Sequence, residues 1–173
     1  CTVGMALTAD YIIPLLFGQA FLPSVGTLQI LSILILIFSI AYFLGHIVLT
    51  AAGLEKKILH ATVAGAIINV IANILLIPSF RQNGAAIASV LSEITVTAIL
   101  LWNARGCYKI SIGKSYVFSL VTAIAVMTVV ICSLKTVLLS RPWVEVIIIA
   151  VAAIGYFIVL LLSKNSVIIE LIQ

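Results

Sequence analysis

Residues 84–102 form an apolar stretch with one carboxylate, Glu93, at its midpoint. A helix rises about 1.5 Å per residue, so about 20 residues cross the roughly 30 Å hydrocarbon core of a bilayer. Glu93 would then lie near the membrane midplane, where an ionisable side chain costs about 3 kcal/mol and normally faces a helix bundle or a water-filled cavity. The stretch therefore predicts an internal membrane helix and not a simple anchor.

The polar and small residues of this stretch recur at helical spacing. Ser89, Glu93 and Thr97 are four residues apart, which places them along one face of a helix. Four residues near its start have little or no side chain: Gly84, Ala85, Ala86 and Ala88. Such residues let a neighbouring backbone come close. We therefore expect a polar seam on a helix that packs against others.

The composition places the whole chain in a membrane. Hydrophobic residues make up 64% and charged residues 8%, with a mean hydropathy of +1.38, whereas a soluble domain carries about 25% charged residues. The net charge of +4 comes from basic residues that lie mostly between apolar spans, so it predicts membrane orientation and no nucleic-acid partner. The three cysteines have no metal-like or disulfide spacing.

The hydrophobic pattern predicts an all-α, polytopic transmembrane bundle of five full spans and one partial span. The full spans are residues 28–51, 58–78, 84–102, 116–139 and 143–163. We interpret residues 1–17 as the end of a truncated transmembrane helix that stops at a Gly/Pro break, and 18–103 as a three-helix core. Residues 104–115 are then a basic cytoplasmic loop, and 116–173 are two further helices with a short tail. Because the chain starts with an apolar Cys1, we expect it to be part of a longer protein.

The first full span, 28–51, has a polar edge. Ser32, Ser39 and His46 recur every seven residues. His46 could titrate or bind a ligand, or it could be an interhelical hydrogen-bonding residue. Gly53, just after the span, is a suitable helix C-cap.

The second span, 58–78, carries a stripe that is small at one end and amide-bearing at the other. Ala61, Gly65, Asn69 and Asn73 are four residues apart, and Pro78 ends the span. The two asparagines either join helices by hydrogen bonds, worth about 0.6–2 kcal/mol each, or line a polar pathway. A short loop, Ser79 to Asn83, is expected to follow.

Basic residues predict the orientation. One side of the membrane collects Lys56, Lys57, Arg105, Lys109, Lys114 and Lys164, and the other collects Arg81, Lys135 and Arg141. Six against three places the first set, and the C-terminus, in the cytoplasm.

The residues favour a transporter over an enzyme. No nucleophile triad, metal-ligand cluster or phosphate-binding glycine loop is visible in the sequence. A deep carboxylate in a bundle with polar seams suits a transporter in which Glu93 binds a coupling cation or changes protonation. The rival is a structural membrane domain, in which Glu93 is permanently hydrogen-bonded to Asn69 or Asn73. A water-filled cavity at Glu93 would distinguish the two.

Several short segments, in order over about ninety residues, carry a family resemblance. They are Ile13-Pro14-Leu15-Leu16-Phe17-Gly18-Gln19-Ala20-Phe21, Leu28-Gln29-Ile30-Leu31, Ala52-Gly53-Leu54-Glu55-Lys56-Lys57, Ile68-Asn69 with Asn73 to Pro78, and Asn83-Gly84-Ala85-Ala86-Ile87-Ala88-Ser89 with Ser92-Glu93. Together they resemble the C-terminal lobe of polysaccharide flippases in the multidrug/oligosaccharidyl-lipid/polysaccharide exporter superfamily. Family members usually have a second glycine near the position of Arg81, so the chain departs from the pattern there.

The resemblance implies a two-lobed transporter that moves undecaprenyl-diphosphate-linked oligosaccharide across the bacterial inner membrane, for surface polysaccharide synthesis. Lipid bilayer, lipid-linked oligosaccharide and polysaccharide polymerase are the implied partners, and no cofactor is expected beyond a coupling proton or sodium ion. Relatives that export drugs or peptidoglycan precursor share the architecture, so both remain alternatives. The candidate cavity-lining or ion-coupling residues are Glu93, Asn69, Asn73, Ser89, Thr97, His46 and Ser39.

Overall fold

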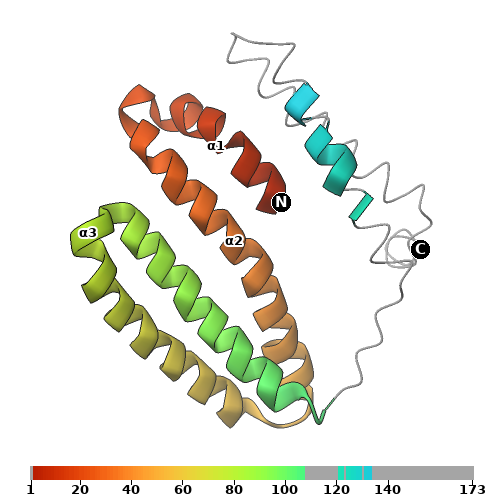
Figure 1. Cartoon of the computed structure of the whole chain (residues 1–173). Helices are drawn as coiled ribbons and strands as arrows, with labels where there is room; N and C mark the ends of the chain where they lie inside the picture. Colours follow the sequence, from red (N-terminus) through yellow and green to blue (C-terminus); the bar gives the residue numbers. More distant parts are fainter. Residues whose placement is uncertain (1, 108–120, 123, 130, 134–173) are drawn as a thin grey trace.

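The computed structural model describes residues 2–107, 121–122, 124–129 and 131–133, and these ranges contain helices and turns with no strand (Figure 1). The prediction of an all-α chain is therefore confirmed for this part. In order, the elements are α1 (Thr2–Phe17), the 3₁₀-helix η1 (Gln19–Ser24), α2 (Val25–Tyr42), the π-helical η2 (Phe43–Leu49) and α3 (Glu55–Ala104).

Helix α1 ends where the sequence predicts, at the Gly/Pro break. Gly18 follows it with φ 85° and ψ 172°, a conformation that is open to glycine and costly for other residues. The Gly18 N–H donates to the Pro14 carbonyl at 3.0 Å, which closes the last turn. The chain then forms η1, which contains Pro23, and turns into α2.

From Gln19 to Leu49 the chain is helical without a break, because η1, α2 and η2 follow one another directly. This stretch is called the first rod below. Its end is a Schellman motif: the Leu54 N–H donates to the Leu49 carbonyl at 2.9 Å, and the Gly53 N–H donates to the Thr50 carbonyl at 3.0 Å. Gly53 has φ 70°, and Leu54 packs on the buried cluster that contains Leu49. The predicted C-cap at Gly53 is thus confirmed.

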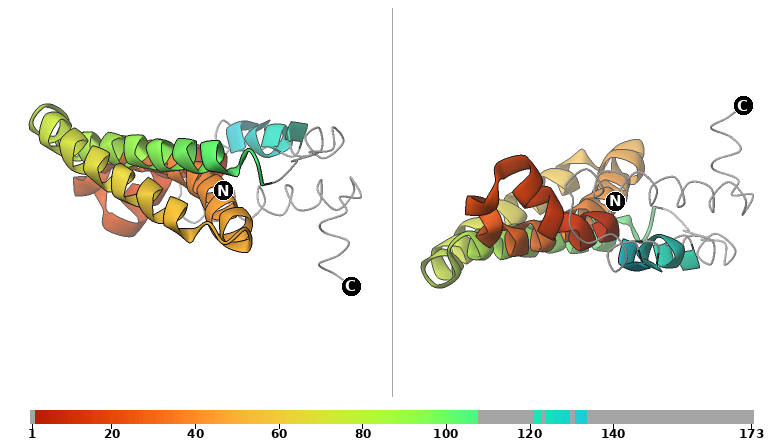
Figure 2. Two further views of the ribbon diagram at one scale, coloured as in Figure 1. Left: turned by 90° about the horizontal axis from the view of Figure 1, so that it is seen from below. Right: turned by 90° about the horizontal axis from the view of Figure 1, so that it is seen from above.

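Helix α3 consists of two arms, residues 55–80 and 82–104, which reverse direction at Arg81 and lie side by side (Figures 1 and 2). Two expectations about this region were wrong. The first arm does not end at Pro78 but passes through it to Phe80, and the predicted loop Ser79 to Asn83 is a reversal at a single residue. Proline removes one backbone hydrogen-bond donor from a helix. Near the end of an arm, one missing bond does not stop the helix, which continues for two more residues.

Small residues set the spacing of the two arms. A Cβ on Gly84 would meet the carbonyl of Leu76 and lie 2.9 Å from the backbone N of Ile77. A Cβ on Gly65 would meet the side chain of Val96 and lie 3.3 Å from the Ser92 carbonyl oxygen. Gly84, Ala86 and Ala88 are buried. The expected close approach of a neighbouring backbone at this end is confirmed.

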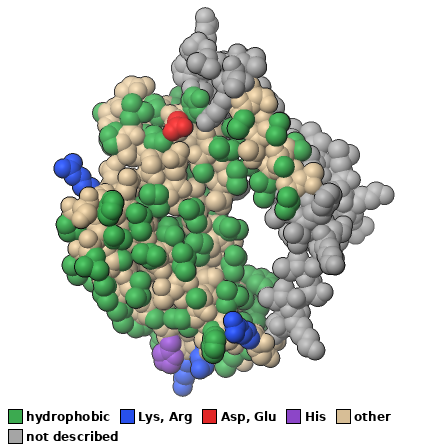
Figure 3. Space-filling view, in the orientation of Figure 1, with side chains coloured by type: hydrophobic (Ala, Val, Ile, Leu, Met, Phe, Trp, Pro, Cys, Tyr) green, Lys and Arg blue, Asp and Glu red, His purple; other side chains and the backbone are tan. Residues whose placement is uncertain are grey.

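The described residues bury little of their apolar surface. One cluster joins the end of α2, η2 and both arms of α3 around Leu44, Leu49, Ala61 and Leu100, and a smaller one joins α1 to Met127 and Ile131. Many large apolar side chains remain exposed, such as Leu36 at 57% and Ile74 at 68%. On the face in Figure 3, hydrophobic side chains cover the middle, and charged side chains lie toward the ends.

Two helices, Gln19–Leu49 and Glu55–Ala104, are long and apolar enough to cross a membrane by length and composition. The arms of the second rise about 39 Å and 34 Å at about 1.5 Å per residue, so each is long enough to cross the roughly 30 Å hydrocarbon core. The predicted count of five full spans is not established, because 143–163 lies outside the described residues and 116–139 is described only at 121–122, 124–129 and 131–133.

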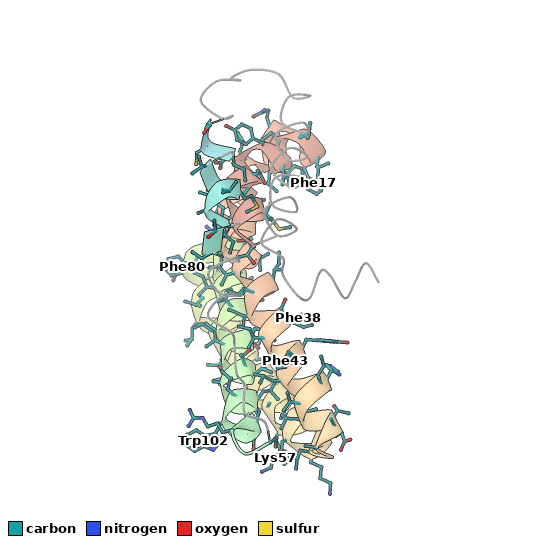
Figure 4. The ribbon with its side chains drawn as sticks, turned by 90° about the vertical axis from the view of Figure 1, so that its right-hand side faces the viewer. Phe17, Phe38, Phe43, Lys57, Phe80 and Trp102 are labelled. Atoms are coloured by element: carbon teal, nitrogen blue, oxygen red, sulfur yellow. The ribbon has the colours of Figure 1, made fainter. Side chains whose placement is uncertain are left out.

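The open end of the α3 hairpin and its reversal carry different numbers of basic residues. Lys56 and Lys57 begin the first arm, and Arg105 follows the second, with its guanidinium 4.8 Å from the centroid of the Trp102 ring. Figure 4 shows Lys57 and Trp102 at this end of the bundle and Phe80 toward the other. Arg81 lies at that other end, as the partition of basic residues in the sequence predicts for these four residues.

Candidate functional site

A cavity of 520 Å³ lies where α2 faces both arms of α3. It is lined by Leu34, Ile35, Phe38 and Ser39 from α2, Asn69 from the first arm, and Ser89, Ser92 and Glu93 from the second. The structure thus brings together four of the seven candidates that the sequence singles out: Ser39, Asn69, Ser89 and Glu93. They come from three separate helical stripes.

The three serines of this cavity use their hydroxyl protons elsewhere. Ser39 Oγ donates to the Ile35 carbonyl at 2.6 Å, and Ser89 Oγ donates to the Ala85 carbonyl at 3.0 Å. Ser92 Oγ donates across the hairpin to the Gly65 carbonyl at 2.8 Å. A hydroxyl has one proton and two lone pairs, so these oxygens offer only acceptor sites to anything that enters the cavity.

The two asparagines bond to each other along their own helix. Asn73 Nδ2 donates to Asn69 Oδ1 at 2.9 Å, which holds the Asn69 amide in one orientation at the cavity wall. Asn73 is not among the lining residues. The structure therefore gives Asn69 a place at the cavity with Asn73 bonded to its amide oxygen, and among the described residues neither forms the expected bond to another helix.

Glu93 lines two neighbouring cavities. The second has a volume of 180 Å³, and its wall includes Phe38 and Glu93, which both cavities share, together with Tyr42, His46 and Thr62. No Lys or Arg lines either cavity. In the part of the chain that the structure describes, Glu93 has no hydrogen bond from Asn69 or Asn73. The fixed-partner arrangement expected of a structural domain is absent from that part.

His46 lies in the π-helical segment η2, which follows α2 directly. Its ring stacks on that of Tyr42, with centroids 4.6 Å apart and planes tilted by 33°. Thr50 Oγ1 donates to the Gly45 carbonyl at 3.1 Å, one residue from His46. π-helical turns are rare and occur often at functional sites. The π-helical segment places His46, with Tyr42, on the wall of the smaller cavity.

Two polar residues of the predicted seams, Thr97 and Ser32, are not among the lining residues of the two cavities. Thr97 is buried and donates to the Glu93 backbone carbonyl at 2.8 Å, and Ser32 is buried and donates to the Gln29 carbonyl at 2.7 Å. The structure therefore does not bring Thr97 into these two cavities with the other candidates.

The sequence reasoning did not single out the aromatic residues of the lining, Phe38 and Tyr42, or two of its hydroxyl residues, Thr62 and Ser92. Phe38, Tyr42 and His46 are four residues apart, so an aromatic stripe was present in the sequence. It could not be told from ordinary lipid-facing or packing residues. Ser92 precedes Glu93 and points to the other arm, which only the hairpin geometry reveals.

The arrangement offers oxygen acceptors and one carboxylate. Serine, amide and carboxylate oxygens are the ligands that hard cations prefer. Within the described ranges no group of three His, Cys, Asp or Glu side chains could hold a metal ion, so any bound cation would rely on hydroxyl and amide oxygens beside Glu93. Such a wall disfavours an anion.

Comparison with known proteins adds no assignment: no family model, no curated protein and no solved structure matches this chain.

Proposed function

We propose that this chain belongs to a cation-coupled membrane transporter, in which the cavity at Glu93 binds the coupling proton or sodium ion. The observation that carries the proposal is the lone carboxylate in an acceptor-rich cavity midway along its helix. Eleven residues, or about 17 Å, separate Glu93 from either end of the second arm. That depth corresponds to the middle of a bilayer.

The proposed cargo is an undecaprenyl-diphosphate-linked oligosaccharide, flipped across the bacterial inner membrane with the C-terminus of the chain in the cytoplasm. This substrate class rests on the sequence resemblance. The physical need is clear, because a diphosphate and sugars cannot leave water for hydrocarbon without a large desolvation cost. A polar-lined path removes that cost while the polyprenyl tail stays in lipid.

The charge of the cavity suits the coupling cation and not the anionic headgroup. A diphosphate would be repelled by Glu93 and would find no Lys or Arg on either cavity wall. The anionic headgroup is therefore bound elsewhere, and the resemblance places the basic residues for it in the other lobe. The cavity described above would serve the coupling cation.

Complementation tests this proposal. The gene that carries this chain is expressed in a bacterium that lacks its own polysaccharide flippase, and surface polymer is measured for wild type, Glu93→Gln and Glu55→Gln. Glu55 is an exposed acid at the start of α3 and serves as the matched control. We expect wild type and Glu55→Gln to restore polymer, and Glu93→Gln to lose at least about 90% of it at equal membrane abundance. Equal rescue by Glu93→Gln would contradict the role of Glu93.

A second candidate function is export of organic cations. The smaller cavity sets Phe38, Tyr42 and His46 beside Glu93, and aromatic faces together with a carboxylate attract organic ammonium ions. Extrusion of a fluorescent cationic dye from intact cells distinguishes this candidate. Dye export that needs Glu93, without polymer rescue, would favour the drug exporter.

A further inference from the structure

The reversal between the arms of α3 holds an arginine in a conformation that suits glycine. Arg81 has φ 50° and ψ −126°. Side chains of L-residues clash with the backbone there, whereas glycine adopts this region freely. Among the described residues, no other non-glycine residue has a positive φ. The fold therefore tolerates Arg81 at a cost that glycine would remove.

Contacts from the two residues that follow Arg81 fix the reversal against η1 and the start of α2. Gln82 Nε2 donates to the Pro23 carbonyl at 2.8 Å, and Thr27 Oγ1 donates to Asn83 Oδ1 at 2.6 Å. Neither contact uses the Arg81 side chain. These bonds would hold the same turn with glycine in place, so the guanidinium is not needed to shape it.

The Phe80 and Arg81 side chains at the reversal are exposed. Arg81 is exposed, and Phe80 beside it is 55% exposed. Figure 4 shows Phe80 projecting from the bundle. In the part of the chain that the structure describes, Arg81 forms no ion pair. The tip of the hairpin thus presents one aromatic ring and one cation.

We propose that Phe80 and Arg81 bind phosphate-bearing lipid headgroups at the membrane surface opposite Lys56, Lys57 and Arg105. The guanidinium meets the phosphate, for which its planar donor fork is suited, and the Phe80 ring lies at the level of the upper acyl chains. The inference needs the membrane location in the proposed function but neither its cargo nor its coupling ion. Anionic phospholipid is the ligand, because it adds a net charge that the arginine can complement.

Because the backbone is strained at Arg81, the single substitution Arg81→Gly should both raise the melting temperature and abolish binding of the lipid headgroup. The purified chain in neutral detergent is melted alone, with phosphatidylglycerol, with phosphatidylcholine and with inorganic phosphate. The variants are Arg81→Gly, Arg81→Lys and Arg105→Gly. Arg105 is the matched control, an exposed arginine at the other end with an ordinary helical φ of −54°.

We expect Arg81→Gly to raise the melting temperature without lipid by at least about 2 °C and to lose the further rise that phosphatidylglycerol gives the wild type. Arg81→Lys should keep part of that rise, and Arg105→Gly should keep all of it without the gain in melting temperature in the absence of lipid.

An unchanged rise in Arg81→Gly, or an equal rise with phosphatidylcholine, would overturn the headgroup site. An equal rise with inorganic phosphate would assign a free-phosphate site instead, and a lower melting temperature for Arg81→Gly would make Arg81 structural. The melting experiment does not depend on polymer export, so failure of this inference leaves the proposed function untouched.

Discussion

At the residue scale, the chemistry of the cavity at Glu93 depends on the groups to which the neighbouring side chains donate hydrogen bonds. Three serines around it donate to backbone carbonyls, and the Asn69 carbonyl accepts from Asn73. The serine oxygens therefore face the cavity as acceptors, the Asn69 Nδ2 group supplies amide donors, and no Lys or Arg lines the wall, which distinguishes it from the anion sites that proteins build from Arg, Lys and backbone N–H groups. One carboxylate in such a wall is suited to a cation.

Ser92 is a residue whose loss should weaken the hairpin. Its hydroxyl gives the bond that joins the arms to the Gly65 carbonyl. We expect Ser92→Ala to lower the free energy of unfolding by about 1 kcal/mol. Ser89→Ala, which loses only a bond within its own helix, is the control and should cost less. Unfolding in mixed detergent micelles measures both, and equal costs would show that the bond between the arms has no special weight.

A glycine at the end of the first rod gives a second prediction at this scale. Gly53 has φ 70°, and a Cβ added there would meet nothing within 4 Å, so the cost of Gly53→Ala comes from the backbone conformation alone. It should amount to about 1 kcal/mol. Gly106→Ala has equal space without the positive φ, and its unfolding free energy should stay within about 0.5 kcal/mol of wild type. Chemical unfolding of the two variants side by side measures the difference.

At the element scale, the hairpin of α3 depends on backbone contact near its reversal. Gly84 faces Leu76 and Ile77 with no room for a side chain. We expect Gly84→Ala to destabilise the chain by about 3 kcal/mol, because backbone atoms cannot move aside as a flexible side chain can. Lowered yield in the membrane fraction and a lower unfolding midpoint would report it. A variant as stable as wild type would mean that the arms are not so tightly apposed.

The elements also show what could be predicted from the sequence. The ends of α1 and of the first rod followed from Gly18 and Gly53, because a positive φ at glycine is a local property. The stripe from Ala61 to Asn73 indicated which face of the first arm packs inward. The passage through Pro78 and the π-helical insertion at His46 could not be predicted, because both depend on packing between helices. Nor could the sequence show that Asn73 bonds to Asn69 and not to Glu93.

At the scale of the whole molecule, α2 and the two arms of α3 place four candidates from separate segments on one cavity. Each stripe was visible in the sequence, but their convergence was not, because it depends on the reversal at Arg81 and on the packing of α2 across both arms. The large apolar exposure of the same helices fits a chain whose remaining surface meets lipid. The described part of the chain thus combines an apolar exterior with a polar cavity at Glu93.

The most direct measurement is thiol labelling in native membranes with a small, membrane-impermeant, water-soluble reagent. Cys1, Cys107 and Cys132 are first replaced by serine, and then Ser89→Cys and Leu91→Cys are compared. Ser89 lines the cavity, whereas Leu91, two residues away, is 43% exposed and lines no cavity described above. We predict that Ser89→Cys reacts and Leu91→Cys does not, because a thiol facing lipid stays un-ionised and unreached. Rapid labelling of Leu91→Cys, with Ser89→Cys slower, would contradict both the membrane placement and the water-filled cavity.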